Sequence, residues 1–146
     1  MHLRVLPFQI PSAWETIKYA VAQMNEIPTD HRLSDYCTWL LHMLLSEKAQ
    51  CWVTLNDDRM LLNVVLTFIS THKITGERQL QIIGIYAFQG LTDTMLSDAM
   101  KLYQRFARTM DCKVITGLSR HQRVCEIMER CGFVPEYHTY VMRIGD

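Results

Sequence analysis

The middle of the chain limits the fold most strongly, because three strand-like segments follow one another there with only short turns between them. Residues 51–55 and the β-branched run at residues 61–70 enclose an Asn-Asp-Asp turn, and Gly76 marks a second turn before residues 79–88. Consecutive strands joined by short turns form an antiparallel meander. A length of 146 residues suits one core of useful size, so we expect a single domain over residues 1–146.

Two helices are predicted before the meander. A strand at residues 3–6 precedes the first helix, which we expect to start at a capping box of Ser12 and Glu15 and to end at Pro28. The second helix starts at Ser34, and its apolar residues spread widely enough around the axis to predict that it is largely buried.

The last third of the chain alternates between helical and strand-like periods. A helix with one apolar face begins near Thr92 or Thr94. Three elements follow it: a strand at residues 113–118, a helix at residues 121–131 that Gly132 stops as a left-handed cap, and a closing strand at residues 136–144. This order predicts an α/β fold with a central mixed, mainly antiparallel sheet of six or seven strands, flanked by helices on both faces.

Charge is balanced in total but uneven along the chain. Lys plus Arg and Asp plus Glu each number 15, yet residues 1–98 carry 7 basic and 10 acidic side chains, whereas residues 99–146 carry 8 and 5. Lys101, Arg105 and Arg108 form a helical stripe that is explained by a solvated helix face or by an acidic ligand or partner. The neutral total, and the lack of aromatic residues among the basic ones, argue against nucleic-acid binding.

The cysteines and the apolar runs bear on the compartment. The 5 cysteines include no Cys-x-x-Cys pair, and the first ten residues lack the apolar run of a signal peptide, so we expect a reducing, cytoplasmic location. No apolar stretch approaches the roughly 20 residues that cross a bilayer. Apolar surroundings make Cys37 and Cys51 structural rather than nucleophilic. His121, Cys125 and Glu129 share a helix face but lack a second ligand pair, so no metal site is expected.

The chain contains the segment Arg-Val-Cys-Glu-Ile-Met-Glu-Arg-Cys-Gly-Phe-Val-Pro-Glu-Tyr from residue 123 and ends with Tyr-Val-Met-Arg-Ile before its last two residues. Together with the order of elements, these segments resemble the GCN5-related N-acetyltransferase (GNAT) superfamily. The match in sequence covers about residues 80–144. Members bind acetyl-CoA where two neighbouring parallel strands separate, with the pyrophosphate on backbone amides at a helix N-terminus. The resemblance implies that acetyl-CoA, if it is used, is bound by Ile85, Tyr86, Ala87, Gly90, Leu91, Thr92, Thr94 and His121.

The chain departs from the family pattern in four places. The phosphate loop keeps a single glycine, Gly90, and Asp93 stands at the start of the helix, where its carboxylate repels a phosphate. No Asp or Glu lies between residues 79 and 92 to act as a general base. In the penultimate helix His121 and Val124 replace the common Asn and Ala, and Met128 replaces the Tyr that protonates the leaving thiolate.

These departures favour a degenerate GNAT-fold protein that acts as an interaction or assembly module, with an acidic protein, other subunits of an assembly or a second copy of the chain as its partner. Short divergent proteins of this kind resemble those of tailed bacteriophages, which implies a place in the host cytoplasm or the virion. The alternative is an acetyl-CoA-dependent N-acetyltransferase acting on a protein or small-molecule amine, in which Tyr137 or Tyr140 replaces the missing acid. Proximity alone accelerates acyl transfer, so the alternative needs cofactor binding above all.

Overall fold

The computed structural model describes residues 1–24 and 32–145. Its strands are β1 (His2–Val5), β2 (Ala49–Leu55), β3 (Leu61–Thr71), β4 (Arg78–Ala87) and β5 (Val114–Gly117). Its helices are the 3-10 turn η1 (Pro7–Gln9), α1 (Ile10–Gln23), α2 (Arg32–Leu45), α3 (Asp93–Thr109) and α4 (Gln122–Arg130).

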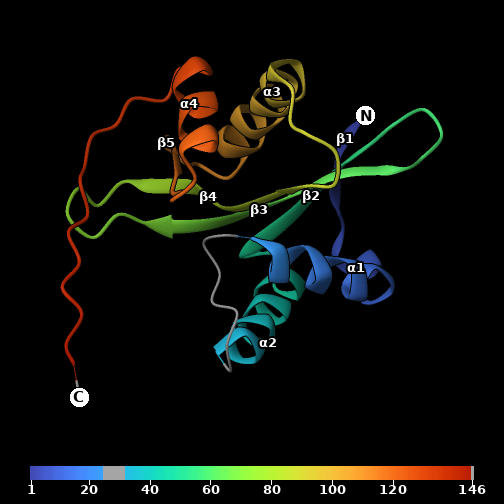
Figure 1. The fold of residues 1–146 in the computed structure, drawn as a ribbon, viewed down its shortest axis with the longest axis horizontal. Coiled ribbons are helices and arrows are strands. Elements are labelled where there is room, and N and C mark those ends of the chain that lie inside the picture. Colours follow the sequence, from blue (N-terminus) through green and yellow to red (C-terminus); the bar gives the residue numbers. More distant parts are fainter. Residues whose placement is uncertain (25–31, 146) are drawn as a thin grey trace.

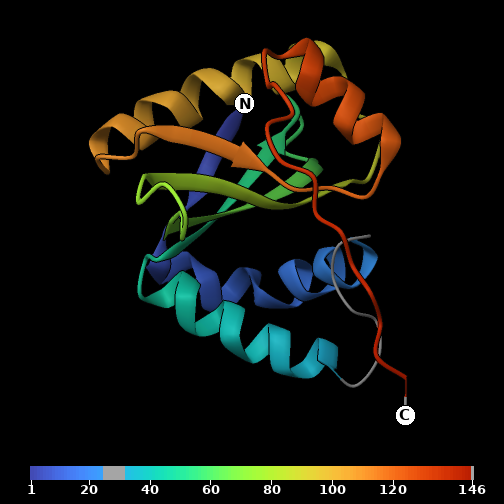
Figure 2. The ribbon, with the colours of Figure 1, turned by 90° about the vertical axis from the view of Figure 1, so that its left-hand side faces the viewer.

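The sheet has the order β1-β2-β3-β4-β5, so neighbours along the chain are neighbours in space. The first four strands pair antiparallel, and β5 joins β4 in parallel after the crossover through α3. Both the predicted meander and the predicted mixed sheet are confirmed. Figure 2 shows α3 and α4 over one face of the sheet and α1 and α2 over the other, as expected for an α/β fold.

The prediction of six or seven strands is wrong, because the described residues form five. The closing strand expected at residues 136–144 is not a strand: this segment is extended but has no ladder partner, and it leaves the body of the fold past the β3–β4 hairpin (Figure 1). Strand propensity alone does not make a strand, since backbone groups need a paired neighbour. The side chains toward its end are unpacked, with Tyr140 90% and Ile144 95% exposed.

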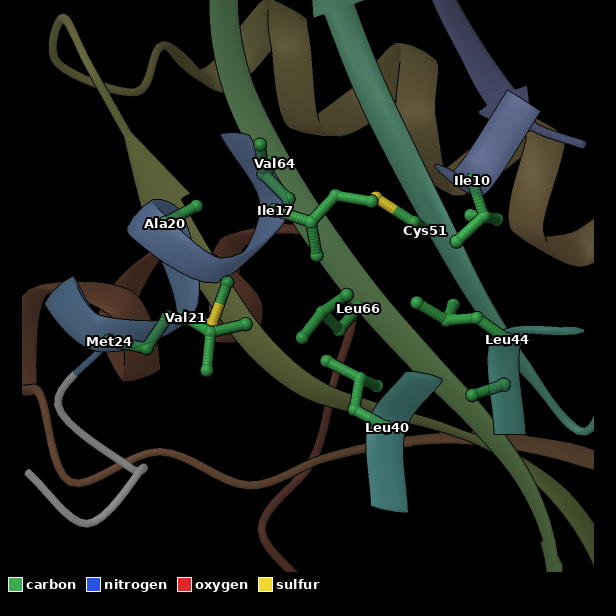
Figure 3. Packing of buried hydrophobic residues seen from close by; sticks show 11 residues of the cluster. Ile10, Ile17, Ala20, Val21, Met24, Leu40, Leu44, Cys51, Val64 and Leu66 are labelled. Carbon is green, nitrogen blue, oxygen red and sulfur yellow. The ribbon is translucent and has the colours of Figure 1, made fainter. Parts of the chain in front are cut away.

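The face under α1 and α2 is filled by aliphatic side chains. Ile17 and Val21 from α1 and Leu40 from α2 meet Leu66 of β3, and all four are buried (Figure 3). Met24, directly after α1, extends this cluster toward β4 and lies against Gly84. Spacings of three and four residues on the helices and of two on the strands produce this match.

The fully buried residues under α3 and α4 are more aromatic and more polar than those under α1 and α2. Trp52 and Tyr103 lie 4.9 Å apart between ring centroids, and Leu80 and Ile82 of β4 pack beside them. The His2 ring bridges Thr54 Oγ1 at 2.7 Å and the Tyr103 hydroxyl at 2.8 Å. The first strand is therefore tied to both β2 and α3 through one imidazole.

A β-bulge changes the phase of β4 halfway along its length. Leu66 pairs with Gly84 and Thr67 with Ile82, which leaves Ile83 without an opposite residue. Beyond the bulge, Ile85 packs under α3 and α4, on the same face as Ile82. A bulge bends its strand and increases the local twist, and this one lies where β5 stops following β4.

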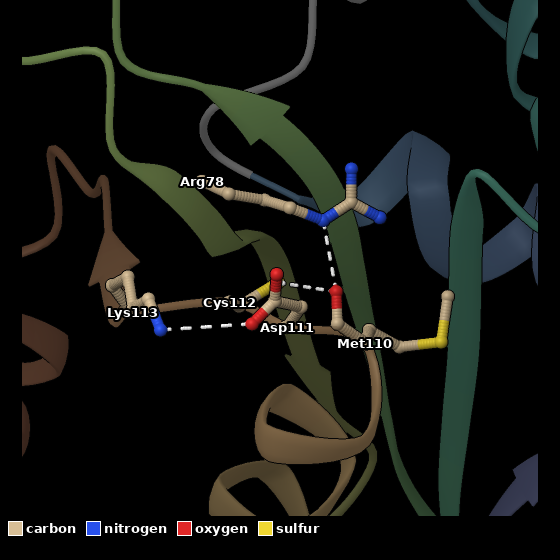
Figure 4. A network of polar contacts seen from close by, with 5 residues as sticks. All are labelled: Arg78, Met110, Asp111, Cys112 and Lys113. Atoms are coloured by element: carbon tan, nitrogen blue, oxygen red, sulfur yellow. Dashed lines mark hydrogen bonds and ion pairs between the residues drawn. The ribbon is translucent and has the colours of Figure 1, made fainter.

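The connection from α3 to β5 fixes the start of the parallel pair (Figure 4). Arg78, at the beginning of β4, donates from Nε to the Met110 carbonyl at 2.8 Å, and its own carbonyl accepts from the Lys113 amide at 2.8 Å. The Cys112 thiol faces the same Met110 carbonyl at 4.0 Å, and Lys113 Nζ lies 3.6 Å from Asp111 Oδ1. These contacts bring β5 alongside β4 in register.

The start of the first helix differs from the prediction. α1 begins at Ile10 rather than at a capping box of Ser12, because Pro11 fits the first helical turn and the 3-10 turn before it already bends the chain. Ser12 lies in the first turn of α1, and its Oγ donates to the Gln9 carbonyl at 3.0 Å instead of capping a helix N-terminus. The helix end expected at Pro28 lies outside the described residues.

No helix in the described ranges is long and apolar enough to span a bilayer.

Candidate functional site

The two parallel strands separate beyond the bulge in β4. β4 and β5 are paired only from Gln79 with Val114 to Ile82 with Gly117, and the last contact is the Leu118 amide to the Ile82 carbonyl at 3.4 Å. β4 continues to Ala87, whereas the chain after β5 turns away into α4. In the described part of the chain, no strand pairs with residues 84–87 on this side, so their outward backbone groups remain free for a ligand.

The gap is a real cleft of about 280 Å³. Parallel strands bring their carboxyl ends to the same edge of a sheet, so the β4–α3 and β5–α4 loops flank its mouth, in the usual ligand position of open α/β sheets. α1 contributes one residue to the wall and α4 several. The lining residues are Gln23, Ile82, Gly84, Ile85, Tyr86, Ala87, Gly90, Leu91, Leu118, Ser119, His121, Arg123, Val124, Ile127 and Met128.

The structure brings most of the predicted binding residues together. Six of the eight line the cleft, namely Ile85, Tyr86, Ala87, Gly90, Leu91 and His121. Thr92 and Thr94 do not. Thr92 is instead the N-cap of α3, and its hydroxyl accepts from the Met95 amide at 3.2 Å, which confirms the predicted helix start.

The two tyrosines suggested as replacement acids lie elsewhere. Tyr137 stacks on His72 of the β3–β4 hairpin, with ring centroids 5.2 Å apart, and Tyr140 is almost fully exposed on the segment that follows. Neither lines the cleft. An acid role for them stays a prediction that this geometry does not favour.

Sequence reasoning missed several cleft residues of the β5–α4 side, including Ser119 and Ile127. The signal that would have found them was present: a strand parallel to β4 ends at residue 117, and a helix starts five residues later. Residues at the carboxyl end of the second parallel strand face the same opening as those of the first.

Gly84, which lines the cleft, and Gly117, at the end of β5, both face methionine thioethers. A Cβ placed on Gly117 would lie 2.7 Å from Met128 Sδ, and one on Gly84 would collide with Met24 Sδ. These positions therefore have no room for a side chain while the methionines keep their places. Met128 stands where many GNAT proteins have a proton-donating tyrosine, and a thioether donates no proton.

The charges at the cleft are cationic. Arg123 is the one charged side chain in the lining, and no carboxylate is among these described residues. Asp93, the expected source of repulsion at the start of α3, lies outside the lining and pairs with Arg130 Nη2 at 3.4 Å. Arg130 thus offsets part of the negative charge that the sequence placed near a phosphate.

Other candidate sites carry less chemistry. Burial raises the pKa of the Cys51 thiol to about 12 and also raises the pKa of Cys37, in agreement with structural roles for both. Within the described residues, no group of three or more His, Cys, Asp or Glu side chains is placed to hold a metal ion.

Comparisons with known proteins place the fold. No family model and no curated protein sequence matches the chain. Among solved structures, the chain is similar to the aminoglycoside 6'-N-acetyltransferase of Acinetobacter baumannii, with a TM-score of 0.74 at 8% identity over 100% of this chain and 98% of that one. A predicted acetyltransferase of Clostridium acetobutylicum, solved with acetyl-CoA, gives 0.73 at 9% identity over 98% and 95%. A putative acetyltransferase of Pyrococcus furiosus gives 0.65 at 18% over 99% of both chains.

The chain therefore has the fold of the GNAT acetyltransferases over nearly its whole length. Identities this low establish the fold alone. The phage-like assembly role, the acidic or identical partner and the cytoplasmic location stay predictions.

Proposed function

We propose that this protein binds acetyl-CoA in the cleft between β4 and β5 and transfers the acetyl group to an amine. The observation that carries the proposal is the open cleft itself, which is lined by six of the eight residues predicted to bind the cofactor. A degenerate fold that no longer used this cofactor would have little reason to keep the two strands apart.

The residues present suit the cofactor's chemistry. The pantetheine arm carries two amide groups in an extended chain, and an extended ligand can pair with a free strand edge by backbone hydrogen bonds. Residues 84–87 of β4 offer such an edge, and apolar side chains of α4, such as Val124 and Ile127, form the opposite wall. Arg123 supplies positive charge for the phosphates.

Acyl transfer needs three things, and the chain supplies two of them. Acetyl-CoA, when bound, supplies an activated thioester: its carbonyl carbon gains a bond to the amine nitrogen and loses the bond to sulfur, which leaves as the thiolate. The cleft contributes orientation, which is a large part of the rate enhancement in such reactions. His121, an exposed imidazole at the N-cap of α4, is the lining residue suited to accept the proton that the amine nitrogen loses, because a ring nitrogen of a neutral imidazole carries a lone pair.

A protein that binds the cofactor without catalysis is the second candidate. Met128 at the position of the usual acid favours it, as does a lining without carboxylates. The two candidates share the cleft and differ only in what happens to the thioester.

Calorimetric titration with acetyl-CoA, followed by an assay for free CoA thiol in the presence of amines, tests both. We expect micromolar binding and amine-dependent thiol release, and the His121→Asn variant should keep the binding and lose most of the release. Binding without release for every class of amine tried would establish the second candidate. No heat at millimolar acetyl-CoA would reject both.

A further inference from the structure

We infer that Arg123 holds the phosphate end of the cofactor through its guanidinium group, in place of the backbone loop that usually does so. The inference rests on the proposed function, because it assigns a role within the same cleft. Three observations support it: the β4–α3 loop has few free amides, Arg123 lines the cleft, and of the two arginines on α4 one forms an ion pair and the other does not within the described residues.

The β4–α3 loop offers few free amides to an anion. It has one glycine, Gly90, where several glycines would be needed for a concave nest of amides. The hydroxyl of Thr92 already accepts from the Met95 amide, which removes one of the unpaired N–H groups at the start of α3. Asp93 adds a carboxylate to that first turn. This end of the cleft therefore has little capacity for a phosphate without help from a side chain.

Arg123 is placed to give that help. It lies in the first turn of α4 and lines the same cleft as Gly90 and Leu91, which belong to the facing loop. The guanidinium group is exposed and forms no ion pair or hydrogen bond within the described residues. A free cation at the mouth of a cleft that lacks carboxylates favours an anionic ligand.

The second arginine of α4 shows what a structural role looks like. Arg130, at the other end of the helix, is paired with Asp93 of α3. Its charge is already compensated, so it ties two helices together and reduces the repulsion near the cleft. Arg123 has no such partner among the residues that the structure describes, and its five N–H donors match the oxygens of a phosphate in a bidentate arrangement.

Truncation of the ligand separates phosphate recognition from every other role of Arg123. Acetyl-CoA contains the phosphates, whereas S-acetylpantetheine contains the same thioester arm without them. We expect Arg123→Gln to weaken acetyl-CoA binding by roughly ten- to a hundred-fold, the range of a lost charge-assisted contact, and to leave the affinity for S-acetylpantetheine unchanged. Arg123→Lys should recover part of the loss.

The matched control is Arg120→Gln, which removes the same charge three residues earlier, in the β5–α4 loop, at a residue that does not line the cleft. Thermal melting of each variant checks that the fold is intact. An equal loss of affinity for both ligands, or the same loss in the Arg120 variant, would overturn the inference, and so would unchanged acetyl-CoA binding by Arg123→Gln. If the wild-type protein binds no acetyl-CoA, the proposed function fails first and takes this inference with it.

Discussion

The two faces of the sheet solve the same packing problem in different ways. Under α1 and α2 the cluster is aliphatic, and its side chains, such as Leu40 and Leu66, need only shape and volume to fit. Under α3 and α4 the sheet also buries polar side chains, including Gln50, Thr54 and Thr67. Buried polar groups are stable only when each finds a partner. The first face can therefore tolerate repacking, whereas the second requires a defined arrangement.

Three of the buried side chains of the second face, Trp52, Thr67 and Gln50, form a connected chain of hydrogen bonds. Trp52 Nε1 donates to Thr67 Oγ1 at 2.9 Å, and Thr67 Oγ1 donates to Gln50 Oε1 at 2.7 Å. Gln50 Nε2 in turn donates to the Glu47 carbonyl at 2.9 Å. The chain fixes β2 against β3 and positions the indole on which α3 packs. Since α3 follows directly on the loop residues Gly90 and Leu91 that line the cleft, the polar face sets the geometry of the proposed site, and the aliphatic face supplies much of the stability.

The largest effect that this comparison predicts is on the aliphatic face. Leu66 is fully buried among Val21 and Leu40, so Leu66→Ala removes buried methyl groups and leaves a cavity. We expect a loss of about 2–5 kcal/mol in the free energy of unfolding. Urea denaturation measures it, and acetyl-CoA affinity of the folded fraction should not change. A loss below about 1 kcal/mol would show that this face collapses around the cavity.

The next effect separates polar from apolar burial. Thr67→Val keeps the shape of the side chain but leaves the indole N–H of Trp52 and the side-chain amide oxygen of Gln50 without a partner. We expect a loss of about 1–3 kcal/mol, measured by the same denaturation. Thr67→Ser keeps the hydroxyl and is the matched control, because it loses only a methyl group. A greater loss in the Ser variant than in the Val variant would contradict the role given to the hydrogen bonds.

The sequence predicts the elements of the fold well where hydrophobic period and turn residues agree. The strand expected at residues 79–88 is β4 at Arg78–Ala87, and the helix expected at residues 121–131 is α4 at Gln122–Arg130. The left-handed cap at Gly132 is confirmed by its φ of 102°. The expected closing strand failed because alternation describes one segment, whereas a strand also depends on a partner elsewhere in the chain.

The site was predictable on the side that precedes α3 and less so on the side that precedes α4. Residues 85–87, Gly90 and Leu91 follow from the resemblance because they belong to one continuous segment. Arg123 and Ile127 enter the cleft through the parallel pairing of β5 with β4, which follows from the strand predicted at residues 113–118, and through the bulge at Ile83, which no local pattern encodes. The ion pair of Asp93 with Arg130 is equally non-local.

A smaller effect on the polar face depends on pH. Burial, and to a lesser degree the adjacent N-terminal charge, lowers the pKa of His2 from 6.5 to about 4, because its ring lies between Trp52, Thr54 and Tyr103. Between these two pKa values the imidazole is protonated in the unfolded chain and neutral in the folded chain. The free energy of unfolding therefore falls as the pH drops from about 6.5 to 4, and outside that window it does not depend on this group.

We expect His2 to account for about 1–2 kcal/mol of this loss, since the ring is only partly buried and solvent screens its charge. Denaturation of the wild type and of His2→Asn at a series of pH values isolates the contribution, because the other titrating groups are common to both. If the free energy of unfolding depends on pH in the same way in both proteins, the imidazole does not have different pKa values in the folded and unfolded chains, and the prediction is wrong.

The smallest effect on stability is expected for Gly90, which lies at the mouth of the cleft and packs against neither face of the sheet. A Cβ on this residue would contact nothing within 4 Å, and its backbone has no positive φ, so the fold alone does not require glycine there. We expect Gly90→Ala to leave the melting temperature unchanged and to weaken acetyl-CoA binding several-fold, because a ligand that approaches the backbone closely is hindered by a methyl group. Gly76→Ala is the opposite control: its φ of 73° at the hairpin turn makes alanine strained, so stability falls while affinity is kept. If Gly90→Ala instead lowers the melting temperature, the loop is part of the packed fold, and the separation of a stabilising face from a binding edge is wrong at this position.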